Sequence, residues 1–173
     1  MRMRRGVTFA AVLLTALTMG LEFAHVLEWP QKQHYSGSLY VRLQESLYIW
    51  FGNLGSVLYV AAVIVTVVLA VLVRRAGGLR WWISTAAALQ VIALASFLTV
   101  ILPVNQRLPV NSAGTVPADW TTLRDRWELG HTVGFLLFAV SFVLLLLTLT
   151  RRAELGDRPE ISSASVPTRP AAR

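Results

Sequence analysis

The sequence predicts an all-α protein, a four-helix transmembrane bundle with both termini on the cytoplasmic side. The chain is 55% hydrophobic and has a mean hydropathy of +0.57, which is more apolar than a water-facing surface tolerates. Its apolar residues form four runs, and each reaches the length of about 20 residues that crosses the hydrocarbon core of a bilayer. The basic residues gather near the ends of these runs. The bilayer is therefore the first expected partner.

The runs place the predicted spans at residues 7–29, 47–73, 81–102 and 129–150. Pro117 and Asp119 suit the first turn of a helix, so we expect the fourth helix to begin near Pro117. Segments 30–46 and 103–116 are predicted external loops, and segment 74–80 is a short internal connection. Residues 1–152 thus form one transmembrane domain. Residues 153–173, rich in Pro, Ser, Ala and Arg, are predicted to be a disordered cytoplasmic tail.

The net charge of +7 reflects topology and does not indicate nucleic-acid binding. Eleven of the sixteen basic residues fall on one side of the predicted spans, and the remaining five are Lys32, Arg42, Arg107, Arg124 and Arg126. The positive-inside rule makes the richer side cytoplasmic. We therefore expect a multi-pass protein of the cell membrane, with no nucleic-acid partner.

Two further features limit the possible classes. The start MRMRR followed by an apolar run resembles a signal peptide, but no small-residue cleavage site closes the run, so an uncleaved span is favoured. The chain contains no cysteine, which excludes disulfides, thiolate metal sites and cysteine nucleophiles. Near the middle of the third span, Gln90 is expected to hydrogen-bond to another helix.

Ionisable residues cluster within two of the predicted spans, where each needs a partner, a water-filled cavity or a function. The first span carries Glu22, His25 and Glu28 at intervals of three residues, which places them on one helix face. The fourth carries Glu128 and His131 at the same interval. His25, Glu28, Glu128 and His131 are therefore the first candidates for a functional site, whereas Glu22 is expected to be a satisfied residue at a helix interface.

Their depth can be estimated from the rise of a helix. His25 lies 18 residues from Val7 and His131 lies 19 from Thr150, which are rises of roughly 27 and 28 Å. Asn53 lies at a similar level in the second span. Three helices are thus expected to contribute polar groups to one layer near the external leaflet.

A His-x-x-Glu facing a Glu-x-x-His is typical of dimetal sites in four-helix bundles. This hypothesis makes His25, Glu28, Glu128 and His131 the ligands of iron, manganese, zinc or copper. Two alternatives remain open. In the first, the same groups form a structural network with Arg124 and Arg126 as counter-charges. In the second, they line a proton or ligand pathway.

Four motifs resemble a known family. They are FAHVLEWPQK, LQESLYIWFG, PVNQRL and DWTTLRDRWELGH, and the resemblance covers about residues 8 to 150. Together they look like the anthrone-oxygenase-like family of small four-helix membrane proteins. The resemblance implies oxygen-dependent oxidation of a flat, lipophilic aromatic molecule. The family's recurring positions match Asn105, Trp120, Arg124 and Trp127.

The leading hypothesis is therefore a membrane oxidoreductase. Its catalytic candidates are His25, Glu28, Glu128 and His131, acting with a transition metal or with no cofactor. Its candidate substrate-binding residues are Asn53, Asn105, Trp120, Arg124 and Trp127. The alternative is a non-enzymatic binding or assembly subunit in which the polar layer fixes helix register. The substrate and the oligomeric state stay open.

Overall fold

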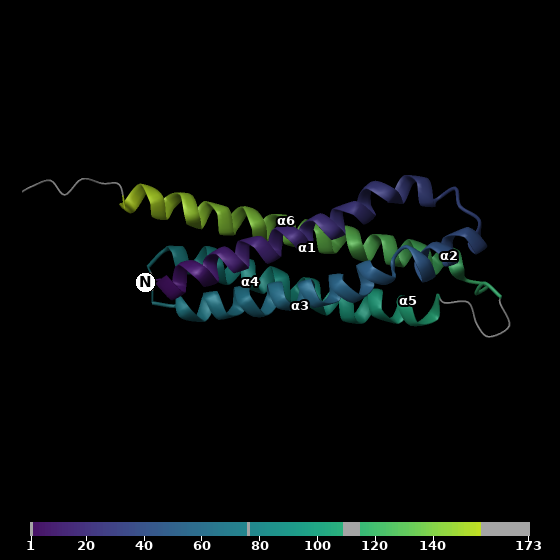
Figure 1. The fold of residues 1–173 in the computed structure, drawn as a ribbon, viewed down its shortest axis with the longest axis horizontal. Coiled ribbons are helices and arrows are strands. Elements are labelled where there is room, and N and C mark those ends of the chain that lie inside the picture. Colours follow the sequence, from purple (N-terminus) through teal and green to yellow (C-terminus); the bar gives the residue numbers. More distant parts are fainter. Residues whose placement is uncertain (1, 76, 109–114, 157–173) are drawn as a thin grey trace, which may run out of the picture.

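The computed structural model describes residues 2–75, 77–108 and 115–156, and all of its regular elements in these ranges are helices (Figure 1). In chain order they are α1 (Arg2–Lys32), α2 (Gly37–Ser46), α3 (Ile49–Leu72), α4 (Leu79–Ser96), the π-helix η1 (Phe97–Ile101), α5 (Leu102–Arg107) and α6 (Trp120–Gly156). The prediction of an all-α chain is confirmed for these residues.

Four helical segments are long and apolar enough to cross a membrane. They are Arg4–Lys32, Ile49–Leu72, Arg80–Arg107 and Trp120–Arg151. Large apolar side chains cover their outer surface, including Phe9 at 69% exposed and Trp50 at 73%. In water such a surface would drive aggregation, whereas in a bilayer it is in contact with lipid. The chain is therefore a membrane protein with four candidate spans.

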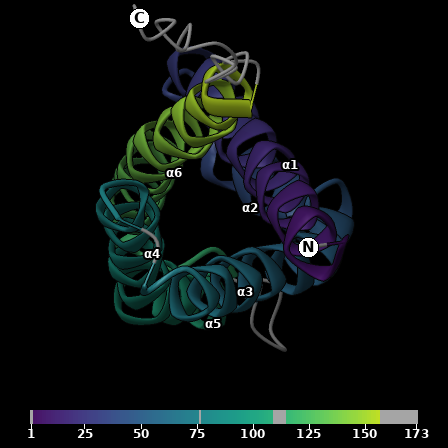
Figure 2. The same ribbon diagram turned by 90° about the vertical axis from the view of Figure 1, so that its left-hand side faces the viewer.

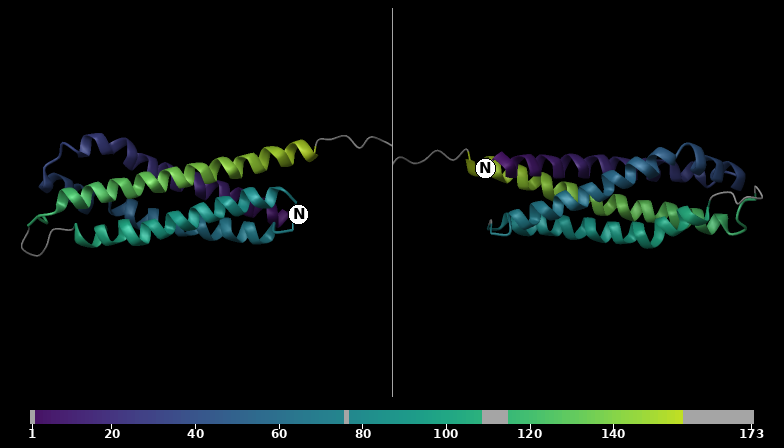
Figure 3. Two further views of the ribbon diagram at one scale, coloured as in Figure 1. Left: turned by 180° about the vertical axis from the view of Figure 1, so that it is seen from behind. Right: turned by 60° about the horizontal axis from the view of Figure 1, so that its bottom comes forward.

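The four long helices pack in a ring. α6 lies against α1 and α4, and α3 closes the ring by contacting both α1 and α4 (Figure 2). The beginning of α1, the connection between α3 and α4 and the end of α6 share one end of the bundle, while α2 and α5 lie at the other (Figures 1 and 3). Below we call the end with α2 and α5 the outer end.

The half of the bundle away from the outer end is tightly packed. Ala11, Leu69, Ile83 and Leu145 are each fully buried there in one cluster. Nearer the middle, Gln90 Nε2 donates a 2.9 Å hydrogen bond to Thr15 Oγ1, which confirms the expected link between helices. The polar candidates occupy the other half.

Both predicted external loops are partly helical. α1 continues past Trp29 through Pro30 to Lys32, and segment 30–46 also contains α2. Inside a helix a proline lacks the N–H for one backbone hydrogen bond and its ring crowds the carbonyl four residues before it, at a cost of about 3 kcal/mol. α1 nevertheless continues two residues beyond Pro30. Ser36 begins α2 as its N-cap by accepting a hydrogen bond from the Leu39 N–H.

The third span is also longer than predicted. It continues through η1 and Pro103 to Arg107. A π-helical turn widens the backbone locally, which is a common way to absorb a proline into a continuous helix. At the other end of the chain, α6 begins at Trp120, close to the expected start, and it extends to Gly156. The first four residues of the predicted tail, 153–156, are thus helical, and the rest lie outside the described residues.

Candidate functional site

A cavity of about 460 Å³ lies in the outer half of the bundle. α3 supplies the largest share of its wall, α1 and α6 supply polar groups, and α2, η1 and α5 complete it. Its lining residues are Thr18, Leu21, Glu22, His25, Gln44, Glu45, Tyr48, Ile49, Phe51, Gly52, Asn53, Gly55, Ser56, Tyr59, Phe97, Asn105, Leu108, Trp127 and His131. The volume suits one small organic molecule.

The cavity brings together about half of the residues singled out from the sequence. His25, Asn53, Asn105, Trp127 and His131 all line it. The two histidine rings lie 4.3 Å apart between centroids, so the depth estimate placed them correctly at one level. The other candidates, Glu28, Glu128, Trp120 and Arg124, lie outside the lining.

His131 forms a buried pair with Glu22. Its Nδ1 lies 2.9 Å from Glu22 Oε2, and both side chains are less than one-tenth exposed. The pairing depends on Gly134, since a Cβ there would lie 2.6 Å from Glu22 Oε2. When an ionised Glu22 accepts the Nδ1–H, the lone pair of the imidazole is at Nε2. A histidine held in this way by a carboxylate is the usual form of a general base.

Several polar atoms of the cavity wall have no hydrogen-bond partner among the described residues. They are Thr18 Oγ1, His25 Nδ1, Gln44 Nε2, Tyr59 OH and His131 Nε2. Buried polar groups are almost always satisfied, because each unsatisfied one costs about 1–3 kcal/mol. A polar ligand or water in the cavity would satisfy them.

Trp127 connects the histidines to Asn105. Its indole ring lies 4.1 Å from the ring of His131 and 4.6 Å from that of His25, centroid to centroid. Its Nε1–H donates a 2.7 Å hydrogen bond to Asn105 Oδ1. Trp127 is only 3% exposed. It is therefore a central packing residue that also fixes the orientation of Asn105.

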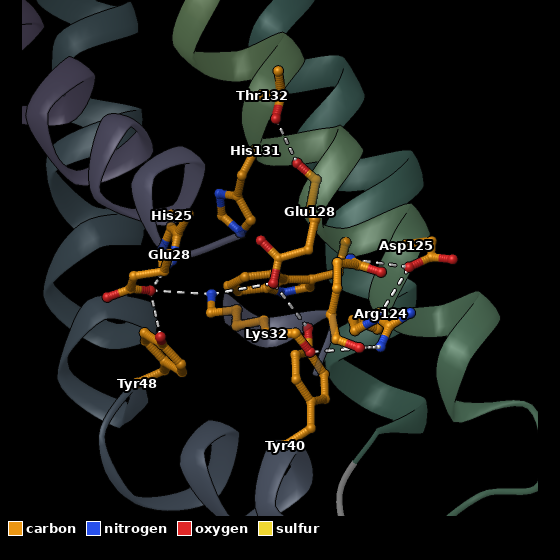
Figure 4. Close-up of polar contacts among 12 residues, drawn as sticks. His25, Glu28, Lys32, Tyr40, Tyr48, Arg124, Asp125, Glu128, His131 and Thr132 are labelled. Carbon is orange, nitrogen blue, oxygen red and sulfur yellow. Dashed lines mark hydrogen bonds and ion pairs between the residues drawn. The ribbon is translucent and has the colours of Figure 1, made fainter. Parts of the chain in front are cut away.

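Lys32 joins the two remaining acidic candidates (Figure 4). Its Nζ lies 3.1 Å from Glu28 Oε2 and 3.1 Å from Glu128 Oε1, so one ammonium bridges two helices. The same nitrogen lies 4.6 Å from the ring centroid of Tyr48 and 4.7 Å from that of Trp127. Although lysine is one of the least often buried residue types, Lys32 is 1% exposed. Pairing with two carboxylates explains its burial.

Two tyrosines complete this network. The Tyr48 hydroxyl donates a hydrogen bond to Glu28 Oε2, and the Tyr40 hydroxyl donates one of 3.4 Å to Glu128 Oε1. Burial raises the pKa of both tyrosines far above the ordinary value, and the neighbouring carboxylates raise each pKa further. Both phenols therefore act as fixed donors to the carboxylates.

The predicted metal site does not fit this arrangement. Lys32 Nζ occupies the position between Glu28 and Glu128 where a bridging metal would bind. His131 pairs with Glu22 and not with the carboxylate three residues before it. Among the described residues, no group of three or more histidines and carboxylates is placed to hold a metal ion. The i, i+3 spacing was correct, but a buried cation from the same chain takes the expected place of the metal.

Arg124 and Trp120 hold the outer ends of the helices. Arg124 Nη1 lies 3.5 Å from the carbonyl oxygen of Lys32 and 3.4 Å from that of Gln33, as a donor to the end of α1. Its guanidinium carbon lies 5.2 Å from the ring centroid of Trp120. Trp120 in turn packs against Gly37, where a Cβ would lie 2.9 Å from its ring. Their predicted contact with substrate is not supported by this placement.

Sequence reasoning missed the importance of three residues. Lys32 was assigned to a loop, although its spacing of four from Glu28 on a continuing helix was a usable signal. Glu22 was noted without a role, because nothing in the sequence indicates which helix it faces. Tyr48 lies at the start of the second predicted span and was given no role. Asn111, a polar residue of the predicted external loop 103–116, lies outside the described residues.

Comparison with known proteins adds no assignment. No family model, no curated protein and no solved structure matches this chain.

Proposed function

We propose that this membrane protein binds a flat, lipophilic aromatic molecule in the cavity and oxidises it with molecular oxygen. This is the activity implied by the resemblance to the anthrone-oxygenase-like family. The observation that carries the proposal is the His131–Glu22 pair at the wall of a cavity that is lined by both polar groups and aromatic or aliphatic side chains. A concave site that offers apolar contact together with convergent polar groups is the usual form of a small-molecule site.

The residues present support proton removal as the first step. An anthrone carries an acidic CH2 group between two aromatic rings. His131 Nε2 would accept one proton from this carbon, and Glu22 would stabilise the resulting imidazolium. His25 and Trp127 lie beside His131 and would pack against the rings of the substrate.

The carbanion then transfers its electrons to molecular oxygen, which is the oxidant. A carbon–oxygen bond forms, and the proton held by His131 completes a substrate hydroperoxide. Loss of the second proton from the same carbon, with cleavage of the oxygen–oxygen bond, releases water and leaves a carbonyl. The balance is one CH2 and one O2 giving one C=O and one H2O. No metal enters any step.

The proposal includes a membrane orientation. The exposed arginines Arg4, Arg5, Arg74, Arg75, Arg80 and Arg151 lie at the end opposite α2 and α5. By the positive-inside rule this end faces the cytoplasm of the cell, so the cavity lies in the external half of the bilayer. Both termini are then cytoplasmic. A lipophilic substrate reaches such a site from the lipid.

Turnover by purified protein in lipid nanodiscs tests the activity. Oxygen consumption and anthraquinone absorbance are followed with anthrone, and empty nanodiscs measure its spontaneous oxidation. We expect His131→Gln to lower the rate about 10²-fold or more, as for loss of a general base. The matched control is His34→Gln, because His34 is exposed at the outer end. Equal rates for His131→Gln and wild type would refute the proposal.

A non-enzymatic binding or assembly subunit is the second candidate. The favouring observation is that Lys32 is ion-paired with both Glu28 and Glu128 of the chain itself, without a ligand. Such a network fixes the register of α1 against α6 without any chemistry. The absence of anthrone turnover, together with a loss of stability in Lys32 variants, would support this candidate.

A further inference from the structure

The cavity opens along the outer half of α3. Its exposed lining residues are Glu45, Ile49, Gly52, Asn53 and Asn105. On the same part of α3, Trp50, Leu54 and Val57 are between 57% and 73% exposed and face outward, which places the opening beside a lipid-facing surface.

Glycines of α3 make room at this opening. A Cβ at Gly52 would have no atom within 4 Å, and one at Gly55 would only touch Leu21 Cδ1 at 3.6 Å. The glycines therefore do not mark a tight helix contact, and the space in front of them belongs to the cavity. Independently, His131 Nε2 is a buried polar atom at the cavity wall with no hydrogen-bond partner among the described residues, so a polar group of a ligand would satisfy it there.

The chemistry of Asn105 follows from its bond to Trp127. An indole N–H only donates, so the amide atom facing it must be the oxygen. This assignment leaves the two hydrogens of Asn105 Nδ2 without an acceptor among the described residues. Since Asn105 lines the cavity, the amide is a donor held in a fixed orientation by a buried tryptophan.

We infer that the ligand carries a carbonyl or phenolic oxygen that accepts a hydrogen bond from Asn105, and that it enters from the lipid past Gly52. The inference rests on the proposed function and deepens it by naming the recognised group and the entrance. Trp127 is the positioning residue, and Asn105 is the binding residue.

A pair of three-ring probes isolates the hydrogen bond. Anthraquinone carries two carbonyl oxygens, and anthracene has the same ring framework without them. Binding to protein in nanodiscs is followed by quenching of tryptophan fluorescence, with empty nanodiscs correcting for partition into lipid. We expect wild type to bind anthraquinone about tenfold more tightly than anthracene, as for one hydrogen bond.

Asn105→Asp is the decisive variant. It keeps an oxygen acceptor for Trp127 and removes only the amide donor. The preference for anthraquinone should disappear, while the affinity for anthracene stays within about twofold. An equal preference in wild type and Asn105→Asp, or no preference in wild type, would overturn the assignment of Asn105.

The entrance is tested separately with leucine. Gly52→Leu should weaken both probes about tenfold or more by filling the opening. A Cβ at this position meets no atom within 4 Å, so the backbone has room for the side chain to begin there. Gly20→Leu is the matched control, because Gly20 is exposed on α1, has nothing within 4 Å and lies outside the cavity. Unchanged binding in Gly52→Leu would refute this entrance.

The two proposals fail in different ways. A wild-type protein that shows the Asn105-dependent preference but no turnover with anthrone contradicts the oxidation and leaves the binding site supported. A protein that turns over anthrone, yet binds both probes equally in wild type and Asn105→Asp, contradicts the role of Asn105 and leaves the oxidation supported.

Discussion

Lys32 Nζ lies 3.1 Å from Glu128 Oε1, and both side chains are almost fully buried. The pair connects the last turn of α1 to α6, and Glu28 shares the same ammonium. We predict that Lys32→Met lowers the free energy of unfolding by about 3–5 kcal/mol, because it leaves two carboxylates without their buried cation. Unfolding of detergent-solubilised protein in a denaturing detergent measures the loss.

An exposed ion pair serves as the control for this prediction. Arg107 Nη2 lies 2.7 Å from Asp119 Oδ2, but these side chains are 60% and 46% exposed. Arg107→Met should therefore change stability by no more than about 1 kcal/mol. Lys32→Met combined with Glu128→Gln should recover part of the loss. A Lys32→Met protein as stable as Arg107→Met would contradict the buried network.

Tyr48 should make the stability of the folded protein decline at high pH. Its pKa is raised by burial and by Glu28, so the unfolded chain loses the phenolic proton first as the pH rises above about 10. The stabilisation is thus complete below that pH and declines above it. Tyr48→Phe should cost about 1 kcal/mol at neutral pH by removing the bond to Glu28.

The pH profile distinguishes this effect from a simple loss of packing. Between pH 9 and 11, the stability of Tyr48→Phe should fall less steeply than that of wild type. Thermal melting over this range in one detergent measures both slopes. Parallel profiles would show that Tyr48 does not carry the alkaline sensitivity.

The helices were predictable because one physical signal defines them. Apolar runs long enough to cross a bilayer indicate spans whatever the packing, so the four segments follow from composition and length. The ends were less predictable, since Pro30 and Pro103 usually stop helices. Here a last turn accommodates Pro30, and a π-helical turn precedes Pro103.

The level of the candidate site along the bundle could be predicted from the sequence, but the contacts between its residues could not. Helix rise sufficed to bring His25 and His131 to one level. The partner of each group depends on helix rotation and crossing, which no spacing within one helix specifies. Glu22 therefore emerged as the partner of His131 only in the structure. Lys32 was missed because the predicted helix ended three residues before it.

The proposed orientation predicts labelling from opposite sides of the membrane. The chain has no cysteine, so single-cysteine variants report one position each. Ser38 is exposed in α2, and Gly78 is exposed at the opposite end with no atom near its Cβ position. A membrane-impermeant maleimide on intact cells should label Ser38→Cys and should label Gly78→Cys only after lysis. The reverse pattern would invert the topology.

Gly134 is predicted to control activity without touching the substrate. A Cβ at this position would lie 2.6 Å from Glu22 Oε2 and 3.1 Å from its Cδ, so alanine must displace the carboxylate from His131. In the proposed reaction an ionised Glu22 accepts the Nδ1–H of His131 and leaves Nε2 as the base, so we expect Gly134→Ala to lower anthrone oxidation about tenfold or more. Its affinity for anthracene should change little, since Gly134 is not part of the cavity wall.

Gly20→Ala is the control for the general effect of a methyl group on a helix, because no atom lies within 4 Å of its Cβ position. Both variants should fold, as alanine favours helix more than glycine does. Activity is measured in nanodiscs beside probe binding. Full oxidation rate in Gly134→Ala would mean that the contact between Glu22 and His131 does not serve the reaction. A lowered rate with intact binding, and normal behaviour of Gly20→Ala, would assign the defect to the displaced carboxylate.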